Sequence, residues 1–169
     1  MTEERSGHGP PHGAALAVEK IRLQSGGLTV LDKVGFQVQP EEVRSVIGPN
    51  GAGKSSLVNV ICGLCRPQSG HVIIDGQRLR HVRPRVLLLD EPMAGMARTE
   101  KAAMAQQIER ARAHLRLAIV LVEHDICVVM RLSDRIAVLD HGVLIADGTP
   151  AEVRHDPEVI RACLGAEAA

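Results

Sequence analysis

The feature that most constrains this sequence is the loop at residues 48–55, which reads GPNGAGKS. It matches the pattern G-x-x-x-x-G-K-[ST] without a mismatch. Glycines at this spacing let consecutive backbone N–H groups turn inward around a phosphate, where a Cβ atom would clash. Residues 42–47 before it are apolar and β-branched enough for a buried strand, and residues 56–63 after it predict a helix. The sequence therefore predicts a phosphate-binding loop between a strand and a helix.

The loop supplies each group that a bound triphosphate needs. The following helix points its positive N-terminal end at the anion. Lys54 adds a mobile positive charge for the β- and γ-phosphates, and the Ser55 hydroxyl can ligate Mg²⁺. A glycine turn before an unrelated helix is the alternative, and the agreement of loop and flanks argues against it. The predicted nucleotide contacts are Gly48, Pro49, Asn50, Gly51, Ala52, Gly53, Lys54, Ser55 and Ser56.

A second motif follows at residues 85–92, RVLLLDEP, an apolar run that ends in two carboxylates and a proline. A run that is apolar on both faces suits a central parallel strand. Acids at the C-terminal end of such a strand lie where open α/β sheets bind ligands. Asp90 is placed to hold Mg²⁺, directly or through water, and Glu91 to orient or deprotonate an attacking water. The alternative is a strand that ends in a solvated acidic turn.

A third candidate is His124, which follows another two-sided apolar strand at residues 117–122. We expect it to emerge at the same sheet edge as Asp90 and Glu91, where it could hydrogen-bond a γ-phosphate. A lone histidine at a strand end is more often structural, so spacing alone leaves both interpretations open.

Composition excludes several classes of function. The 169 residues carry 20 basic and 20 acidic side chains, so there is no electrostatic case for a nucleic-acid partner. One Phe with no Trp or Tyr argues against base stacking on single strands. No apolar run approaches a membrane span, and the charged start at residues 1–5 does not resemble a secretory signal. We expect a cytoplasmic chain with reduced cysteines.

The rest of the chain predicts one domain over residues 14–165, after a disordered tail at residues 1–13. Strand patterns at 14–23 and 30–38 suggest a hairpin. Further predicted elements are a strand at 71–74, helices at 99–115 and 126–132, strands at 135–140 and 143–147, and a helical tail from Thr149 to about residue 165.

Cys62 and Cys65 form a C-x-x-C pair at the end of the phosphate-loop helix. Cys62 is expected to be a small core residue. A zinc or redox site, with His71 or His81 as further ligands, is the alternative, but no second C-x-x-C completes it.

These motifs together resemble the ATP-binding subunit of ABC transporters, particularly that of branched-chain amino acid importers. Four stretches carry the resemblance: VIGPNGAGKSSLVNVICGL, LLLDEPMAGM, IVLVEHDICVVMRLSDRIAVLDHG and IADGTPAEVRHDPEVIRACLG. Residues 14–82 and 83–165 each match in the family's order. The resemblance implies an α/β fold with a P-loop NTPase core, a mostly parallel sheet flanked by helices, and a small antiparallel β subdomain.

The resemblance also implies roles and partners. ATP and Mg²⁺ would be the cofactors, with Lys54 and Ser55 on phosphate and Mg²⁺, and Asp90 on Mg²⁺. Glu91 would be the catalytic base and His124 the switch histidine. The implied partners are a second ATP-binding subunit, which sandwiches ATP, and a membrane permease that would hold the chain at the inner face of the cell membrane.

The departures from the family concern the segment between residues 76 and 85. There the family carries a glutamine loop, a helical subdomain that contacts the permease, and an LSGGQ-like signature that opens a helix. Here only residues 77–84 bridge the gap, so all three are expected to be missing, and Gln77 is too close to the preceding turn to replace the glutamine. The LQSGG at residues 23–27 lies before the phosphate loop and is not a signature.

Two single residues depart as well. Ser25 stands where the family usually stacks an aromatic ring on adenine, and Ala97 where it commonly has Asp or Asn after the second motif. We therefore predict that Mg-ATP binding survives, weakened, and that hydrolysis is slow or absent. A nucleotide-binding module without turnover and a poorly folded, internally deleted product are the alternatives. We also expect residues 77–84 to form an extended surface loop, and the deletion to leave apolar strands with bare faces or edges.

Overall fold

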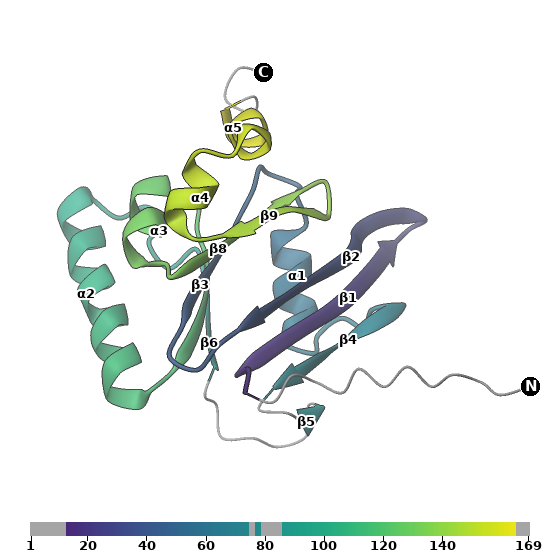
Figure 1. The fold of residues 1–169 in the computed structure, drawn as a ribbon, viewed down its shortest axis with the longest axis horizontal. Coiled ribbons are helices and arrows are strands. Elements are labelled where there is room, and N and C mark those ends of the chain that lie inside the picture. The colour runs from purple at the N-terminus through teal and green to yellow at the C-terminus, as the bar shows by residue number, and fades with distance from the viewer. Residues whose placement is uncertain (1–12, 75–76, 79–85, 165–169) are drawn as a thin grey trace, which may run out of the picture.

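The computed structural model describes residues 13–74, 77–78 and 86–164, whose strands form two sheets (Figure 1). One is antiparallel, in the order β2-β1-β4-β5, and the other has the order β6-β7-β3-β8-β9, parallel except for the β8–β9 pair. The predicted α/β class with a small antiparallel subdomain is confirmed. The strands are β1 Leu16–Ser25, β2 Leu28–Val38, β3 Val43–Ile47, β4 Ser69–Ile74, β5 Gln77–Arg78, β6 Val86–Asp90, β7 Ala118–Val122, β8 Arg135–Asp140 and β9 Val143–Gly148.

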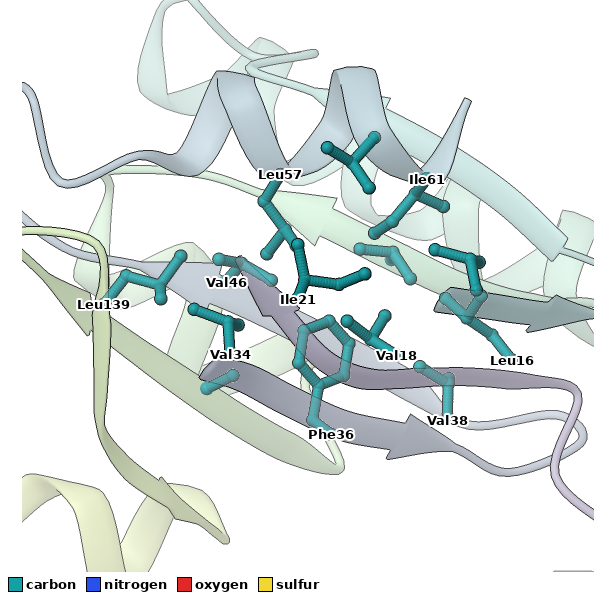
Figure 2. Close-up of a cluster of buried hydrophobic side chains, with 14 of the residues drawn as sticks. Leu16, Val18, Ile21, Val34, Phe36, Val38, Val46, Leu57, Ile61 and Leu139 are labelled. Atoms are coloured by element: carbon teal, nitrogen blue, oxygen red, sulfur yellow. The ribbon is translucent and has the colours of Figure 1, made fainter. Parts of the chain in front are cut away.

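Both sheets share one core with helix α1 (Lys54–Ile61). Figure 2 shows Leu57 and Ile61 pointing from α1 toward Ile21 of β1, with Val34 and Phe36 of β2 on the far side. Val46 of β3 and Leu139 of β8 belong to the same cluster. This central core therefore fixes the helix after the phosphate loop against both sheets, and a single Phe is the one aromatic ring in it.

Helices α2 (Arg98–Leu115) and α3 (Ile126–Leu132) cover the other face of the parallel sheet. Ala105 and Ile108 of α2 pack on Ile119 and Leu121 of β7, in a second cluster that we call the α2 core. The alternation of side chains along β7 explains why all five of its residues are buried: each face meets a different core.

The C-terminal segment forms two helices rather than the single helical tail that was predicted. α4 spans Pro150–Arg154 and α5 spans Pro157–Leu164. Thr149 caps α4 in a capping box with Glu152, as its sequence suggested. The break comes at residues 155–156 because Pro157 lacks an N–H and disfavours a helical conformation in the residue before it.

The prediction for Cys62 is wrong: this cysteine is exposed, and Cys65 is only partly buried. The apolar stripe of α1 is instead Leu57, Val60 and Ile61. Gly63 adopts φ 74, and the amides of Gly63 and Leu64 donate to Val60 and Asn59, which is the Schellman pattern of helix termination. Cys62 is therefore the C-cap of α1 and no longer lies on the buried face of the helix.

The strand of the second motif is parallel, as predicted, but it is not central. β6 lies at the end of its sheet and pairs only with β7 among the strands of the described residues. Its side chains from Val86 to Leu89 are partly buried, whereas every residue of β3 and β7 is buried. Among the described strands, β6 is therefore an edge strand, which agrees with the edge expected from the deletion.

Two predictions fall wholly or partly outside the described residues. Of the tail at 1–13, only Gly13 is described. Of the expected loop at 77–84, residues 77–78 are described, and they form the short strand β5 paired with Ile73 and Ile74 rather than loop. His81 also lies outside the described part.

Candidate nucleotide-binding site

The phosphate loop begins where β3 ends, and two of its glycines are required by their surroundings. Gly48 has φ 149, and a Cβ on it would stand 1.9 Å from the carbonyl oxygen of Leu139. Gly53 has φ 96, and a Cβ there would meet the Val30 carbonyl oxygen and a Leu31 methyl at 2.9 Å. The loop is therefore pressed between β8 and β2, where only glycine fits both the backbone conformation and the space.

Lys54 is the first residue of α1 and is buried, with 9% of its surface exposed. Its ammonium group donates to the carbonyl oxygens of Gly48 at 2.8 Å and Pro49 at 3.0 Å. The side chain thus folds back over the loop itself, so that its charge lies at the rim that a phosphate would approach. Ser55, the next residue, is exposed at the start of the helix. A triphosphate and Mg²⁺ fit this set of donors and oxygen ligands.

The two acids of the second motif reach the same sheet edge. The strand register sets Asp90 beside Val122 of β7, and Val122 beside Val46 of β3. Asp90 is therefore two strands from the end of β3, roughly 10 Å along the hydrogen-bonding direction. Asp90 and Glu91 are both exposed, and Glu91 adopts φ 47, an uncommon value for a residue with a side chain. Such strained backbone is concentrated at functional sites.

His124 follows β7, the strand between β3 and β6, so it emerges between the phosphate loop and the acids. Its side chain is 61% exposed, and Nδ1 lies 3.8 Å from a carboxylate oxygen of Glu123. The structure brings the ends of the three strands that carry the predicted residues to one edge. It leaves the functional role of His124 a prediction.

Glu123 is a residue that the sequence reasoning passed over. It is 1% exposed, and its carboxylate accepts from the backbone N–H of Met93 at 3.0 Å and from that of His124 at 3.2 Å. It ties the end of β7 to the turn that follows Glu91, so it positions both candidate site segments. A glutamate directly after a fully apolar strand is the only sequence signal that could have drawn attention to it.

Asp125 and Lys101 connect this turn to α2. Their side chains are 2.6 Å apart, and Asp125 also accepts from the amides of Cys127 and Val128 as the N-cap of α3. The hydrogen bond from Lys101 is the main reason why the pKa of Asp125 is lowered, and the same bond raises the pKa of Lys101. Both groups therefore stay charged around neutral pH and hold α3 against α2.

Helix α5 also approaches the site, which the sequence did not predict. A cavity of about 650 Å³ beside the loop is lined by Pro49, Asn50 and Gly51 on one side and by His141 and Arg161 on the other. The side chains of a histidine and an arginine from the C-terminal part of the chain therefore lie beside the phosphate loop.

The C-x-x-C alternative gains no support from the described part of the chain. There, no group of three or more His, Cys, Asp or Glu side chains could hold a metal ion. His71 instead pairs with Glu19, Nε2 to carboxylate oxygen at 2.9 Å.

A phosphate loop between β3 and α1, with two acids ending a parallel strand of the same sheet, defines the class of P-loop nucleotide-binding proteins. Comparison with known proteins then narrows the class. The family described as "ABC transporter" matches residues 31–85, and "Branched-chain amino acid ATP-binding cassette transporter" matches residues 143–169. Over these two stretches the chain is similar to the ATP-binding proteins of ABC transporters.

Individual relatives show the same likeness. The chain is 25% identical to the high-affinity branched-chain amino acid transport ATP-binding protein LivG of Escherichia coli K12, covering 89% of this chain and 97% of LivG. It is 29% identical to the zinc import ATP-binding protein ZnuC of Jannaschia sp., over 85% of this chain and 86% of ZnuC. CbiO1 from Clostridium perfringens, described as part of the ABC transporter complex cbiONQ, has a like fold, with a TM-score of 0.78, 20% identity, and coverage of 88% and 94%.

The alignment with LivG spans 248 positions, whereas this chain has 169 residues, so at least 79 aligned positions have no counterpart here. The "ABC transporter" match ends at residue 85, immediately before β6. Separately, none of the helices in the described residues is long and apolar enough to cross a membrane.

Proposed function

We propose that this chain is an ATP-binding subunit of the branched-chain amino acid import type that binds Mg-ATP but turns it over slowly or not at all by itself. Lys54 and the loop amides would hold the triphosphate, and Ser55 and Asp90 would hold Mg²⁺. Glu91 would orient the attacking water and accept its proton, and His124 would contact the γ-phosphate. Bound Mg²⁺ would neutralise charge on the β- and γ-phosphates.

The observation that carries this proposal is the shared edge of β3, β7 and β6, in one parallel register. The phosphate loop, His124 and the two acids follow the ends of these three strands, which lie at one sheet edge. The assignment to amino acid import rests on the match at residues 143–169 and on LivG, while the likeness to ZnuC leaves the solute open to test. A cytoplasmic position beneath a permease belongs to the same proposal.

We propose weak turnover because the segment between β5 and β6 is much shorter than in the ABC family. Between β5 and β6 there are only residues 79–85, too few for a glutamine loop, a helical subdomain and a signature motif. In the family's ATP sandwich, the signature of one chain donates hydrogen bonds to the γ-phosphate held by the other. Loss of one such donor typically lowers kcat about 10²–10³-fold. A second candidate, a nucleotide-binding module that never hydrolyses, is favoured by this same shortness.

Binding and turnover can be measured separately. We expect Mg-ATP to raise the melting temperature of the chain, and phosphate release by the chain alone to be roughly 100-fold or more below that of an intact relative measured alongside. Glu91→Gln should lower any residual release, and should change nothing in a module without hydrolysis. Turnover at the rate of the intact relative would refute the proposed impairment, and no thermal shift with Mg-ATP would refute the function.

Lys54→Ala tests the binding site itself. We expect binding of a fluorescent ATP analogue to weaken about tenfold to hundredfold, because charge-assisted hydrogen bonds to phosphate are lost. Lys20→Ala is the matched control, since it removes the same charge from an exposed position in the antiparallel sheet and should leave the affinity unchanged. Equal affinities for the two variants would contradict the assignment of Lys54.

A further inference from the structure

Along the edge of β6 that faces away from β7, the backbone groups find no partner strand among the described residues, and the direction of each group follows from the strand. The N–H of Glu91 donates to the carbonyl of Val122 in β7 at 2.9 Å. Backbone N–H and C=O directions alternate along a strand, so Leu87 and Leu89 face β7 as well. Val86, Leu88 and Asp90 therefore direct their N–H and C=O groups away from β7. No strand of the described residues pairs with these groups on that side.

The side chains of this edge strand are apolar on both faces. Val86 and Leu88 pack against the central core, and Leu87 and Leu89 against the α2 core. All four remain only partly buried, although one pair packs against the cluster that contains α1 residues and the other against the cluster that contains α2 residues. A strand of this kind is suited to an interior position, and an edge that stays unpaired is a template for another strand.

We propose that β6 pairs antiparallel with β6 of a second copy of this chain, about a two-fold axis at Leu88, to form one continuous sheet through both copies. In this register Val86 lies opposite the partner's Asp90, Leu87 opposite the partner's Leu89, and Leu88 opposite itself. It is the one antiparallel register that pairs all five residues of the strand while matching outward groups with outward groups.

Two arguments, the placement of charge and the closure of the assembly, favour a second copy of this chain over another polypeptide as the partner of the β6 edge. An antiparallel pair keeps the two Asp90 carboxylates apart, whereas a parallel in-register pair would set them side by side. A lone extended peptide would leave a new open edge, but a second β6 brings its own β7 and its own covering helices. The two-fold operation pairs the β6 edges of both copies with each other and leaves neither of them open, so the assembly closes at two copies.

This pairing needs no nucleotide, which separates it from an ATP-sandwiched dimer and from the proposed function. Sedimentation velocity of the full chain without ATP should show a concentration-dependent dimer. A chain that is monomeric without ATP at all concentrations, or that dimerises only with Mg-ATP, would overturn the proposal. Higher oligomers without a dimer would also overturn it.

Charge changes at residue 86 test the register. In this register residue 86 of each copy lies opposite Asp90 of the other copy. Val86→Asp therefore creates two pairs of like charge across the interface, whereas Val86→Lys creates two pairs of opposite charge at the same positions. Both variants place a charge at the same partly buried position, so a general loss of stability would affect them alike. We expect the dimer dissociation constant of Val86→Asp to exceed that of Val86→Lys by about tenfold. Equal constants, or the reverse order, would exclude this register.

Leu88→Pro tests the backbone pairing. Proline removes an N–H that faces the open edge and leaves the β7 ladder intact, as edge strands tolerate. We expect a monomer that keeps its circular dichroism spectrum, whereas Val143→Lys, on the opposite edge strand, should remain dimeric. A dimer of Leu88→Pro as stable as that of the unchanged chain would contradict the proposal. Should this variant fail to fold, the comparison at residue 86 decides.

Discussion

Gly48→Ala is expected to lower the free energy of unfolding by about 3 kcal/mol or more. The added Cβ would stand 1.9 Å from the Leu139 carbonyl oxygen, which is backbone and cannot rotate away. Relief would require β3 and β8 to move apart, although Ile47 and Val138 lie side by side in their register. The backbone at φ 149 adds strain for any residue with a side chain. Urea unfolding followed by circular dichroism measures the loss.

Gly51→Ala is the matched control within the same loop. Gly51 also has a positive φ, 80, but a Cβ there would meet nothing within 4 Å. We expect a loss of only about 1 kcal/mol, from backbone strain alone. If the two variants were equally destabilised, the close approach of the loop to β8 would not be what selects glycine at residue 48.

The phosphate loop could be predicted from sequence because its requirements are local. Eight consecutive residues, 48–55, fix the turn, the helix start and the lysine, and their neighbours only support them. The strand of the second motif and the strand before His124 could be predicted for a related reason. A short run that is apolar on both faces fits an α/β fold mainly as a strand of the parallel sheet. Their ends then meet at one edge by topology alone.

The parts that were missed depend on contacts between distant residues. The apolar pattern VLLL predicted a central strand because it is the same for a central and an edge strand, whereas among the described strands β6 has a neighbour on one side only. Glu123 joins the two site segments only because the fold brings the backbone N–H of Met93, 30 residues earlier, within hydrogen-bond distance of its carboxylate. Cys62 was placed in the core by helical periodicity, which does not include the Schellman turn that ends the helix there.

Arg44 is a further case, since it lies in a strand whose pattern predicts apolar burial. It is 3% exposed in β3. Its Nε donates to Glu42 at 3.0 Å and its Nη1 to Asp147 at 2.7 Å, and its guanidinium carbon lies 5.6 Å from the centre of the Phe36 ring. Asp147 is 103 residues away in sequence, so no local pattern could reveal that the charge is satisfied.

Arg44→Ala is expected to lower the free energy of unfolding by about 3–5 kcal/mol, because it leaves the buried carboxylate of Glu42 without its cation. Arg135→Ala is the matched control. Arg135 contacts the same Asp147 carboxylate at 3.0 Å, but its side chain is 42% exposed. An exposed ion pair contributes at most about 1 kcal/mol, so the control should lose little. Both variants remove an arginine from the Asp147 carboxylate, but only Arg44→Ala also leaves the buried carboxylate of Glu42 without its cation.

The double variant Glu42→Met/Arg44→Met separates charge from packing. If the unpaired carboxylate causes the loss, removing both charges and keeping the apolar volume should restore much of the stability. The restoration should be incomplete, because Glu42 also accepts the backbone N–H of Gln39. β3 leads directly into the phosphate loop, so binding of a fluorescent ATP analogue should fall with stability in Arg44→Ala and recover in the double variant. A double variant no more stable than Arg44→Ala would show that packing around the guanidinium, and not the buried charge, holds this strand.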